Sequence, residues 1–369
     1  MSLNTIWGTR FPLIQAPMAG VQNSALALAV SRAGALGSLP AAMLDAQSLR
    51  RELQVLQASG LPYNVNFFCH QAPTHTAQAE QTWRAALQPY YQAFGIDALT
   101  IPTSAGRRPF DDEMAEVLEE FSPTVVSFHF GLPSQALLSR VQARGAFVVS
   151  SATTLTEALW LQDQGADGVI AQGLEAGGHR GHFLERDVTL QHYTADLLRQ
   201  LMPQISLPVI AAGGIADAQG VQLALDAGAS VVQVGTAFLL CDEATTSAVH
   251  RVRLQDVDAP TVLTNLFSGG LARGLFNRVM HELGPHNLAA PAFPMATSAI
   301  APLRARAEAQ GLDDFTPLWS GTNRQGCLQA PAAEVVQRLV AGLGNTRDAS
   351  QTSSRTGAPS NAVLVKKAS

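Results

Sequence analysis

The chain has 369 residues, of which 47% are hydrophobic and 14% are charged, and its formal net charge is −5. This composition is typical of a globular protein with a large core, and it excludes disorder over most of the chain. The mild negative charge, with a pI near 6.0, gives no electrostatic attraction for nucleic acid or for an anionic membrane.

Eight short apolar segments alternate with helical segments along the first two thirds of the chain. Parallel strands need crossover helices between them, and eight such strands close into a barrel. The sequence therefore predicts a (β/α)8 TIM barrel. The predicted strands are residues 12–16, 35–39, 63–68, 124–130, 146–150, 167–171, 207–212 and 230–234.

Capping residues predict where several helices of this alternation begin. Ser24 is expected to cap a helix that ends at Gly34, and Asp217 one that ends at Gly228. Two further helices are expected over 45–58 and 154–164. Each lies between consecutive predicted strands, as the barrel requires.

The domain organisation follows from where this alternation stops. We expect the barrel to occupy 1–242 and a small, mostly helical covering domain to occupy 243–316, because no strand alternation appears there and prolines break an Ala-, Arg- and Leu-rich stretch into helices. Residues 317–344 are expected to return to the barrel. The Ser-, Thr- and Asn-rich segment 345–369 is expected to be a disordered tail.

A glycine-rich loop follows the sixth predicted strand, within the sequence GADGVIAQGLEAGGHRG of residues 165–181. Gly177 and Gly178 precede His179, and glycine lets a backbone approach a ligand closely. The loop would place an imidazole at the carboxyl end of a barrel strand, where such barrels carry their active sites. A solvated histidine on an ordinary glycine turn is the alternative.

Two glycine-containing turns follow the seventh and eighth predicted strands. They are Gly213-Gly214 and Gly235-Thr236. In barrels, the loops after these two strands supply backbone N–H groups to a phosphate. Tight turns without a ligand are the alternative, and the absence of a GxxxxGK[ST] motif argues against a nucleoside triphosphate.

Three uncharged amides lie near predicted strand ends: Asn66, Gln172 and Gln233. An amide can both donate and accept hydrogen bonds, which suits the edge of a flavin ring. Together with a phosphate site they predict flavin mononucleotide (FMN). His129 faces either the barrel mouth or the core.

Metal, disulfide and Schiff-base chemistry are not expected. The cysteines Cys69, Cys241 and Cys327 are dispersed, and the His179 loop lacks a metal-ligand pattern. The only lysines are Lys366 and Lys367, so the folded part has no amine for a Schiff base. No apolar run approaches a membrane span and the amino terminus lacks a signal sequence, so we expect a cytoplasmic protein.

An ordered set of motifs runs from Phe11 to about Gly342: PLIQAPMAG, NVNFF, VSFHFGLP, GVIAQGLEAGGHRG, PVIAAGGI and VVQVGTAFLLC. As a set they resemble those of the bacterial nitronate monooxygenases, formerly called 2-nitropropane dioxygenases. ARGLFNRVM and PLWSGTNRQG resemble further elements of that family.

This resemblance implies an FMN-containing barrel that oxidises alkyl nitronates with O2 to a carbonyl compound and nitrite. It places the catalytic histidine at His179 and implies a monomer or a homodimer. Carried over by position, the FMN contacts are Ala16, Pro17, Met18, Asn66, Gln172, Gly177, Gly214, Gln233, Val234, Gly235 and Thr236, beside Gly213 from the phosphate turn.

The covering segment departs from the family pattern. Family members that act well on an acidic nitronate present tyrosines and a lysine to it, whereas Phe293 stands here where a tyrosine is expected. Because burying an unpaired carboxylate is costly, simple alkyl nitronates should be preferred to propionate 3-nitronate. The exception would be an arginine that points into the mouth, and the nearby candidates are Arg273, Arg278 and Arg304.

Two other functions fit the same residues. One is a flavin reductase that uses NAD(P)H, of the enoyl-acyl-carrier-protein or quinone type, whose members share the AGGH loop. The other is a flavin-binding module that has lost turnover, which the missing tyrosine and lysine would explain.

Overall fold

A computed structural model describes residues 2–73, 76–102 and 107–343. Eight parallel strands form a ring in the order β1-β9-β8-β6-β5-β4-β3-β2. Backbone hydrogen bonds between the Leu13–Gln15 strand and Leu36 close it. The strands are β1 (Leu13–Gln15), β2 (Gly37–Pro40), β3 (Tyr63–Phe68), β4 (Val125–His129), β5 (Phe147–Ala152), β6 (Gly168–Gln172), β8 (Val209–Ala212) and β9 (Val231–Val234).

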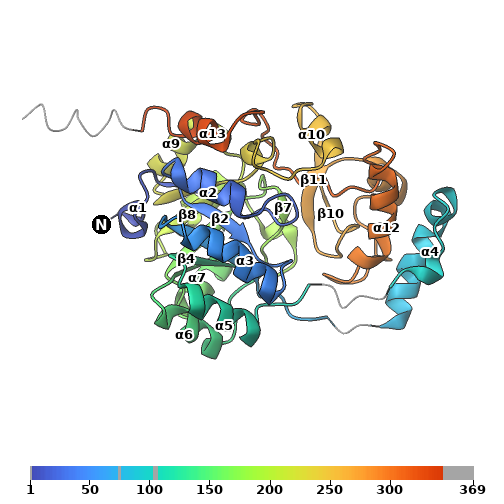
Figure 1. Cartoon of the computed structure of the whole chain (residues 1–369), viewed down its shortest axis with the longest axis horizontal. Coiled ribbons are helices and arrows are strands. Elements are labelled where there is room, and N and C mark those ends of the chain that lie inside the picture. The colour runs from blue at the N-terminus through green and yellow to red at the C-terminus, as the bar shows by residue number, and fades with distance from the viewer. Residues whose placement is uncertain (1, 74–75, 103–106, 344–369) are drawn as a thin grey trace, which may run out of the picture.

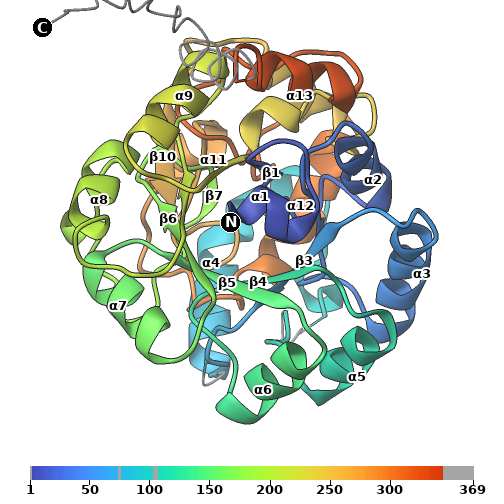
Figure 2. The same ribbon diagram turned by 90° about the vertical axis from the view of Figure 1, so that its left-hand side faces the viewer.

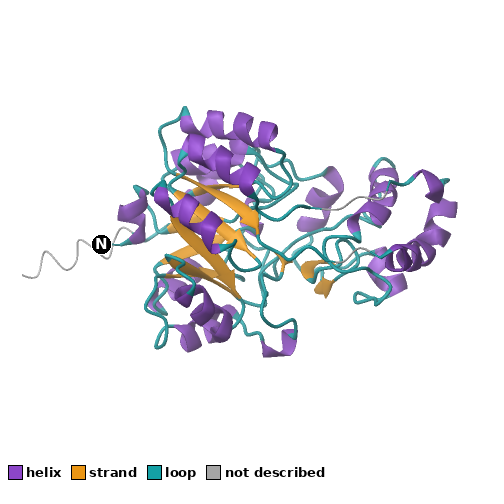
Figure 3. Cartoon of the chain, turned by 90° about the horizontal axis from the view of Figure 1, so that it is seen from below, coloured by secondary structure: helices purple, strands orange, loops and turns teal. Residues whose placement is uncertain are grey.

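Helices surround this ring, as Figure 2 shows in a view along the barrel and Figure 3 from the side. The predicted TIM barrel is thus confirmed, because each predicted strand overlaps an observed one. The surrounding helices are α2 (Ser24–Arg32), α3 (Ala46–Gln57), α5 (Asp112–Phe121), α6 (Gln135–Ala143), α7 (Leu155–Asp163), α8 (Thr194–Leu201), α9 (Ala218–Asp226) and α13 (Ala332–Leu339).

Of the two predicted capping residues, Asp217 is confirmed and Ser24 is wrong. The Asp217 carboxylate accepts a hydrogen bond from the Gly220 N–H at 2.7 Å and begins α9. In α2 the cap is Asn23, whose side chain accepts from the Ala25 N–H, and not Ser24. Both residue types are good caps, so the sequence alone cannot choose between neighbours.

The amino-terminal end of the barrel is closed by α1 (Leu3–Trp7), which Figure 2 shows over the centre of the ring. Leu3 and Trp7 are buried with apolar side chains that point into the barrel, including Ile170 and Ile210. Trp7 packs edge-on against Phe147 at 5.5 Å. Because side chains fill the amino-terminal end of the barrel, a cavity can form only at the opposite end, where the carboxyl ends of the strands lie.

The covering domain lies beside that carboxyl end (Figure 1) and is not made of helices alone. It contains an antiparallel hairpin, β10 (Thr261–Thr264) and β11 (Ala272–Leu275), in a segment where no strand alternation is apparent in the sequence. The strands are only four residues each and the Gly269-Gly270 turn lies between them, so the sequence shows no clear alternation of apolar and polar residues. Its helices are α10 (Ala248–Leu254), α11 (Arg278–Leu283) and α12 (Thr297–Glu308).

A helix from between β3 and β4 packs against this domain. The Trp83 indole of α4 (Ala77–Ala93) donates to the Ala296 carbonyl at 3.1 Å, and the Tyr91 hydroxyl donates to the Ala299 carbonyl at 2.7 Å. In sequence α4 lies inside 1–242, but its buried side chains share a core with α12. Long-range packing of this kind has no local signal.

Short elements complete the described chain: β7 (Gly178–His179) and the 3-10 turns Ala98–Thr100, Val188–Leu190 and Thr236–Phe238. No helix in the described ranges is both long enough and apolar enough to cross a membrane. The expected tail 345–369 lies outside the described residues.

Candidate active site

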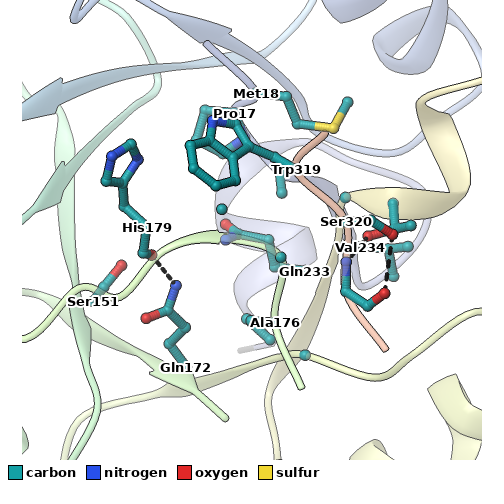
Figure 4. Close-up of a pocket in the computed structure, with 18 of the residues that line it drawn as sticks. Pro17, Met18, Ser151, Gln172, Ala176, His179, Gln233, Val234, Trp319 and Ser320 are labelled. Carbon is teal, nitrogen blue, oxygen red and sulfur yellow. Dashed lines mark hydrogen bonds between the residues drawn. The ribbon is translucent and has the colours of Figure 1, made fainter. Parts of the chain in front are cut away.

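A cavity opens at the carboxyl ends of the barrel strands, with about 1310 Å³ of empty space including its mouth. Figure 4 shows part of its wall, with His179 and Trp319 near each other. All the residues that the sequence singled out for the site line it: Ala16, Pro17, Met18, Asn66, Gln172, Gly177, His179, Gly213, Gly214, Gln233, Val234, Gly235 and Thr236. The barrel topology brings these distant segments to one end.

The loop that carries His179 is held through its own backbone. The His179 carbonyl accepts from the Gln172 amide at 2.9 Å, and it bonds the His129 imidazole at 3.1 Å. The Gln172 oxygen accepts from the Gly181 N–H at 2.7 Å. One N–H of Gln172 therefore remains for a ligand, while the rest of that amide positions the loop.

His129 lies at the cavity wall with both ring nitrogens engaged, one by the His179 carbonyl and the other by Ser151 at 3.0 Å. Burial lowers the pKa of His129 to about 4, so the ring is neutral near pH 7. The two expectations for this residue are thus both partly met, since it faces the cavity and is also hydrogen-bonded.

Arg180, the residue after His179, anchors the loop from beneath. Its fully buried guanidinium donates to the Gln191 side chain at 2.8 Å and to the carbonyls of Gly173 and Gln172 at 2.7 and 2.8 Å. These bonds tie the start of the loop to its end. Nothing in the sequence distinguished this arginine from a surface one.

The loop also pairs with the covering domain. Gly178 and His179 form the short strand β7, which adds to the edge of the hairpin opposite Arg273 and Ala272 of β11. The Arg180 N–H continues the pairing by donating to the Leu271 carbonyl at 2.8 Å. The position of His179 therefore depends on both domains.

The imidazole of His179 meets a serine and aromatic rings. Its Nε2 lies 2.8 Å from the Ser268 hydroxyl, and its ring packs edge-on against Phe293 and Trp319 at 5.1 and 5.4 Å. Burial first, and then the positive charge of Arg107, hold the pKa of His179 well below its usual value. The side chain is therefore neutral near pH 7.

Nδ1 of His179 has no hydrogen-bond partner within the described ranges. If Ser268 donates to Nε2, Nδ1 carries the ring proton and can donate to a ligand oxygen. If Ser268 accepts, Nδ1 has the free lone pair and can take a proton. The same geometry thus allows a donor and a base, depending on the tautomer.

The turns after β8 and β9 form the other end of the cavity. Gly213 and Gly214 have φ values of +126° and +72°, which non-glycine residues rarely adopt. Within the described part of the chain their N–H groups donate to no protein acceptor. Their carbonyls are fixed by Thr194 and Asn323, at 3.0 and 3.1 Å. Free N–H groups on a fixed backbone suit an anion such as a phosphate.

Two buried amides between these ends have unused hydrogen-bonding capacity. The side-chain oxygen of Gln233 is buried and has no hydrogen-bond partner in the described part of the chain. Asn66 donates to the Ser127 hydroxyl and carbonyl at 3.0 and 3.1 Å, which leaves its oxygen free to accept. An orphaned buried oxygen is costly, so a ligand donor is expected there. These residues fit a flavin ring whose phosphate lies on the glycine turns.

The carboxyl segment contributes wall residues that the sequence singled out only as a family-like stretch. They come from PLWSGTNRQG, residues 317–326, and are Trp319, Ser320, Gly321 and Asn323. The Gly321 N–H donates to the Thr236 hydroxyl at 3.0 Å. Ser268, from the covering domain, was missed, although the glycine pair after it marked a constrained turn.

The three arginines considered for the mouth are engaged elsewhere. Arg273 donates to the Leu174 carbonyl at 2.8 Å, Arg278 pairs with Glu282 and Asp314, and Arg304 pairs with Glu308. A different arginine, Arg107, lines the cavity. Among the described residues no group of three His, Cys, Asp or Glu is placed to hold a metal ion.

Comparison with known proteins decides the family. A profile described as nitronate monooxygenase matches residues 1–342. The chain belongs to the nitronate monooxygenase family. This membership confirms the resemblance that the motif set indicated.

Relatives in this family cover nearly the whole chain. A nitronate monooxygenase of Pseudomonas aeruginosa is 40% identical over 339 residues, with 90% of this chain and 96% of that protein covered. One of Paraburkholderia phytofirmans is 38% identical over 346 residues, with 92% and 93% covered. The structure of nitroalkane oxidase from Streptomyces ansochromogenes is similar with a TM-score of 0.85, 34% identity and 95% and 99% coverage.

Proposed function

We propose that this protein binds FMN and oxidises alkyl nitronates with O2 to a carbonyl compound and nitrite. The observation that carries the proposal is one cavity with free glycine N–H groups at one end, unsatisfied amides in the middle and a neutral His179 at the other. The membership of the nitronate monooxygenase family supports the same activity.

Residues at different positions along the cavity would bind different parts of FMN. Gly213, Gly214 and the turn at Gly235 would bind the phosphate, while Asn66 and Gln233 would accept from the flavin ring. The flavin, when bound, supplies the electron acceptor for the nitronate. Ala16 and Pro17, on the turn after β1, would pack against it from the opposite wall.

His179 would contact the nitro group of the substrate. A neutral imidazole can donate through Nδ1 to a nitronate oxygen, or take the α-proton of a neutral nitroalkane as a general base. Phe293 and Trp319 exclude water beside it, and Ser268 fixes the ring. A neutral ring avoids burying a second cation beside Arg107.

Cofactor release and turnover test the proposal. Purified protein should be yellow and release FMN, and not FAD, on denaturation. Flavin-loaded enzyme should consume O2 and form nitrite with primary nitronates, while NADH or NADPH should not bleach the flavin under anaerobiosis. Rapid anaerobic bleaching without nitronate turnover would establish the reductase instead, and bound flavin with neither reaction would establish a binding module.

A further inference from the structure

Arg107 places a cation in the cavity wall. It follows the α4 segment and lines the cavity together with Phe68 and His179. Its side-chain nitrogen Nη1 is buried and has no hydrogen-bond partner among the residues that the structure describes. A guanidinium has five N–H donors, so a buried one without a partner is expensive.

The surroundings hold this guanidinium in place without neutralising it. Its central carbon lies 6.0 Å from the ring centre of Phe68 and 5.8 Å from that of Phe293. His70 bonds the Arg107 carbonyl at 3.1 Å and so fixes the backbone. Aromatic faces stabilise a cation only modestly.

No carboxylate of the described chain lies within ion-pair distance of Arg107, whereas the next residue, Arg108, pairs with Glu113 at 2.9 Å. Among the described residues of the cavity wall, Glu175 is the only acidic one; it accepts hydrogen bonds from Thr194 and packs beside Gly214, at the glycine end. Burial lowers the pKa of Arg107, and no acid raises it back. The missing negative charge must therefore come from a ligand.

We propose that Arg107 binds a carboxylate carried by the substrate, at the end remote from the nitro group that His179 contacts. The assignment rests on the proposed nitronate oxidation. It reverses the preference for simple alkyl nitronates that Phe293 and the missing lysine indicated, because the required arginine comes from a segment outside the covering stretch.

A carboxylate fits this site better than other anions do. The planar guanidinium matches a carboxylate in a two-point hydrogen bond. A single cation neutralises one negative charge, whereas a phosphate monoester would leave an uncompensated charge among Phe68 and Phe293. Arg107 is thus a specificity-determining residue, and it does not itself take or donate a proton in the reaction.

Two nitronates of equal carbon number isolate the effect. Propionate 3-nitronate and propyl 1-nitronate differ by a carboxylate in place of a methyl group. Arg107→Met should lower kcat/KM for the carboxylated substrate by about 10–100-fold and change that for propyl 1-nitronate by less than about threefold. Arg107→Lys should recover part of the loss. Arg108→Met, which removes the adjacent exposed arginine, should leave both values unchanged.

Binding of propionate, which has no nitro group, gives a readout that does not depend on turnover. Titration calorimetry of flavin-loaded protein should show weaker propionate binding to Arg107→Met than to the wild type and to Arg108→Met. That result would hold even if nitronate oxidation were not the activity.

Three results would overturn the proposal. The first is an equal loss of kcat/KM for both nitronates, which would show that Arg107 binds the nitronate group. The second is loss of FMN from both Arg107 variants. The third is an unchanged affinity of Arg107→Met for propionate.

Discussion

At the scale of single residues, the described part of the site combines neutral polar groups with the cation Arg107, while the acidic Glu175 lies at the glycine end. His179 and His129 are both neutral near pH 7, since burial lowers the pKa of each. His129 and Gln172 bind the His179 backbone, which leaves the His179 side chain to face the cavity. The imidazole is therefore positioned through its main chain and through Ser268.

Replacing His179 by alanine should abolish activity selectively while FMN remains bound. A positioned acid or base contributes about 10²–10⁴-fold. The loss should be greater for neutral nitroalkanes, which require deprotonation, than for preformed nitronates. Steady-state kinetics with both substrate forms measure this, with His286→Ala, an exposed residue outside the cavity wall, as the control. Wild-type rates in the mutant with both forms would make His179 structural.

At the scale of elements, the loop that carries His179 contacts both the barrel and the covering domain. Its strand β7 pairs with β11, and Gly177 packs directly on the segment that returns from the covering domain. A Cβ at Gly177 would lie 2.5 Å from the backbone of Ser320 and Gly321. This glycine is required by close approach of two backbones and not by a positive φ.

Gly177→Ala should therefore push the 320–321 segment away from the loop and weaken FMN binding. Both partners are backbone atoms that cannot rotate aside, so we expect destabilisation of about 1–3 kcal/mol. Gly220→Ala in α9 adds the same methyl group with contacts no closer than 3.4 Å, and should be neutral or slightly stabilising. Urea unfolding and FMN titration of both variants make the comparison, and equal stabilities would contradict the close approach.

At the scale of the whole molecule, the fold buries several histidines in neutral form. Burial lowers the pKa of His129, His182 and His250 to about 4 in each case. Unfolded histidine titrates near 6.5, so between that pH and about 4 the unfolded chain binds more protons than the native one. Stability should therefore fall as the pH falls through this window, and level off below it.

The contribution of the fully buried His250 can be isolated. Each such histidine should steepen the fall of the unfolding free energy by up to about 1.4 kcal/mol per pH unit within that window. His250→Gln should make the slope between pH 6 and 4.5 shallower by that amount, whereas the exposed His286→Gln should not change it. Urea unfolding of flavin-loaded protein across this range measures both slopes, and identical slopes would refute the neutral buried state of His250.

The sequence by itself determined the barrel and most of the cavity wall. The strands are short apolar segments after glycine turns, and the carboxyl ends of parallel strands in a barrel must meet, so Gln172, Gly213 and Gln233 could be brought together on local signals alone. Only the tertiary structure decided which side chains lie opposite these three residues across the cavity. Arg107 and Ser268 lie in segments whose side-chain directions depend on packing between α4, the hairpin and the barrel, and no periodicity encodes contacts so distant in the chain. For the same physical reason, the arginine of the cavity lies between β3 and β4 and not in the covering stretch that holds the three candidate arginines.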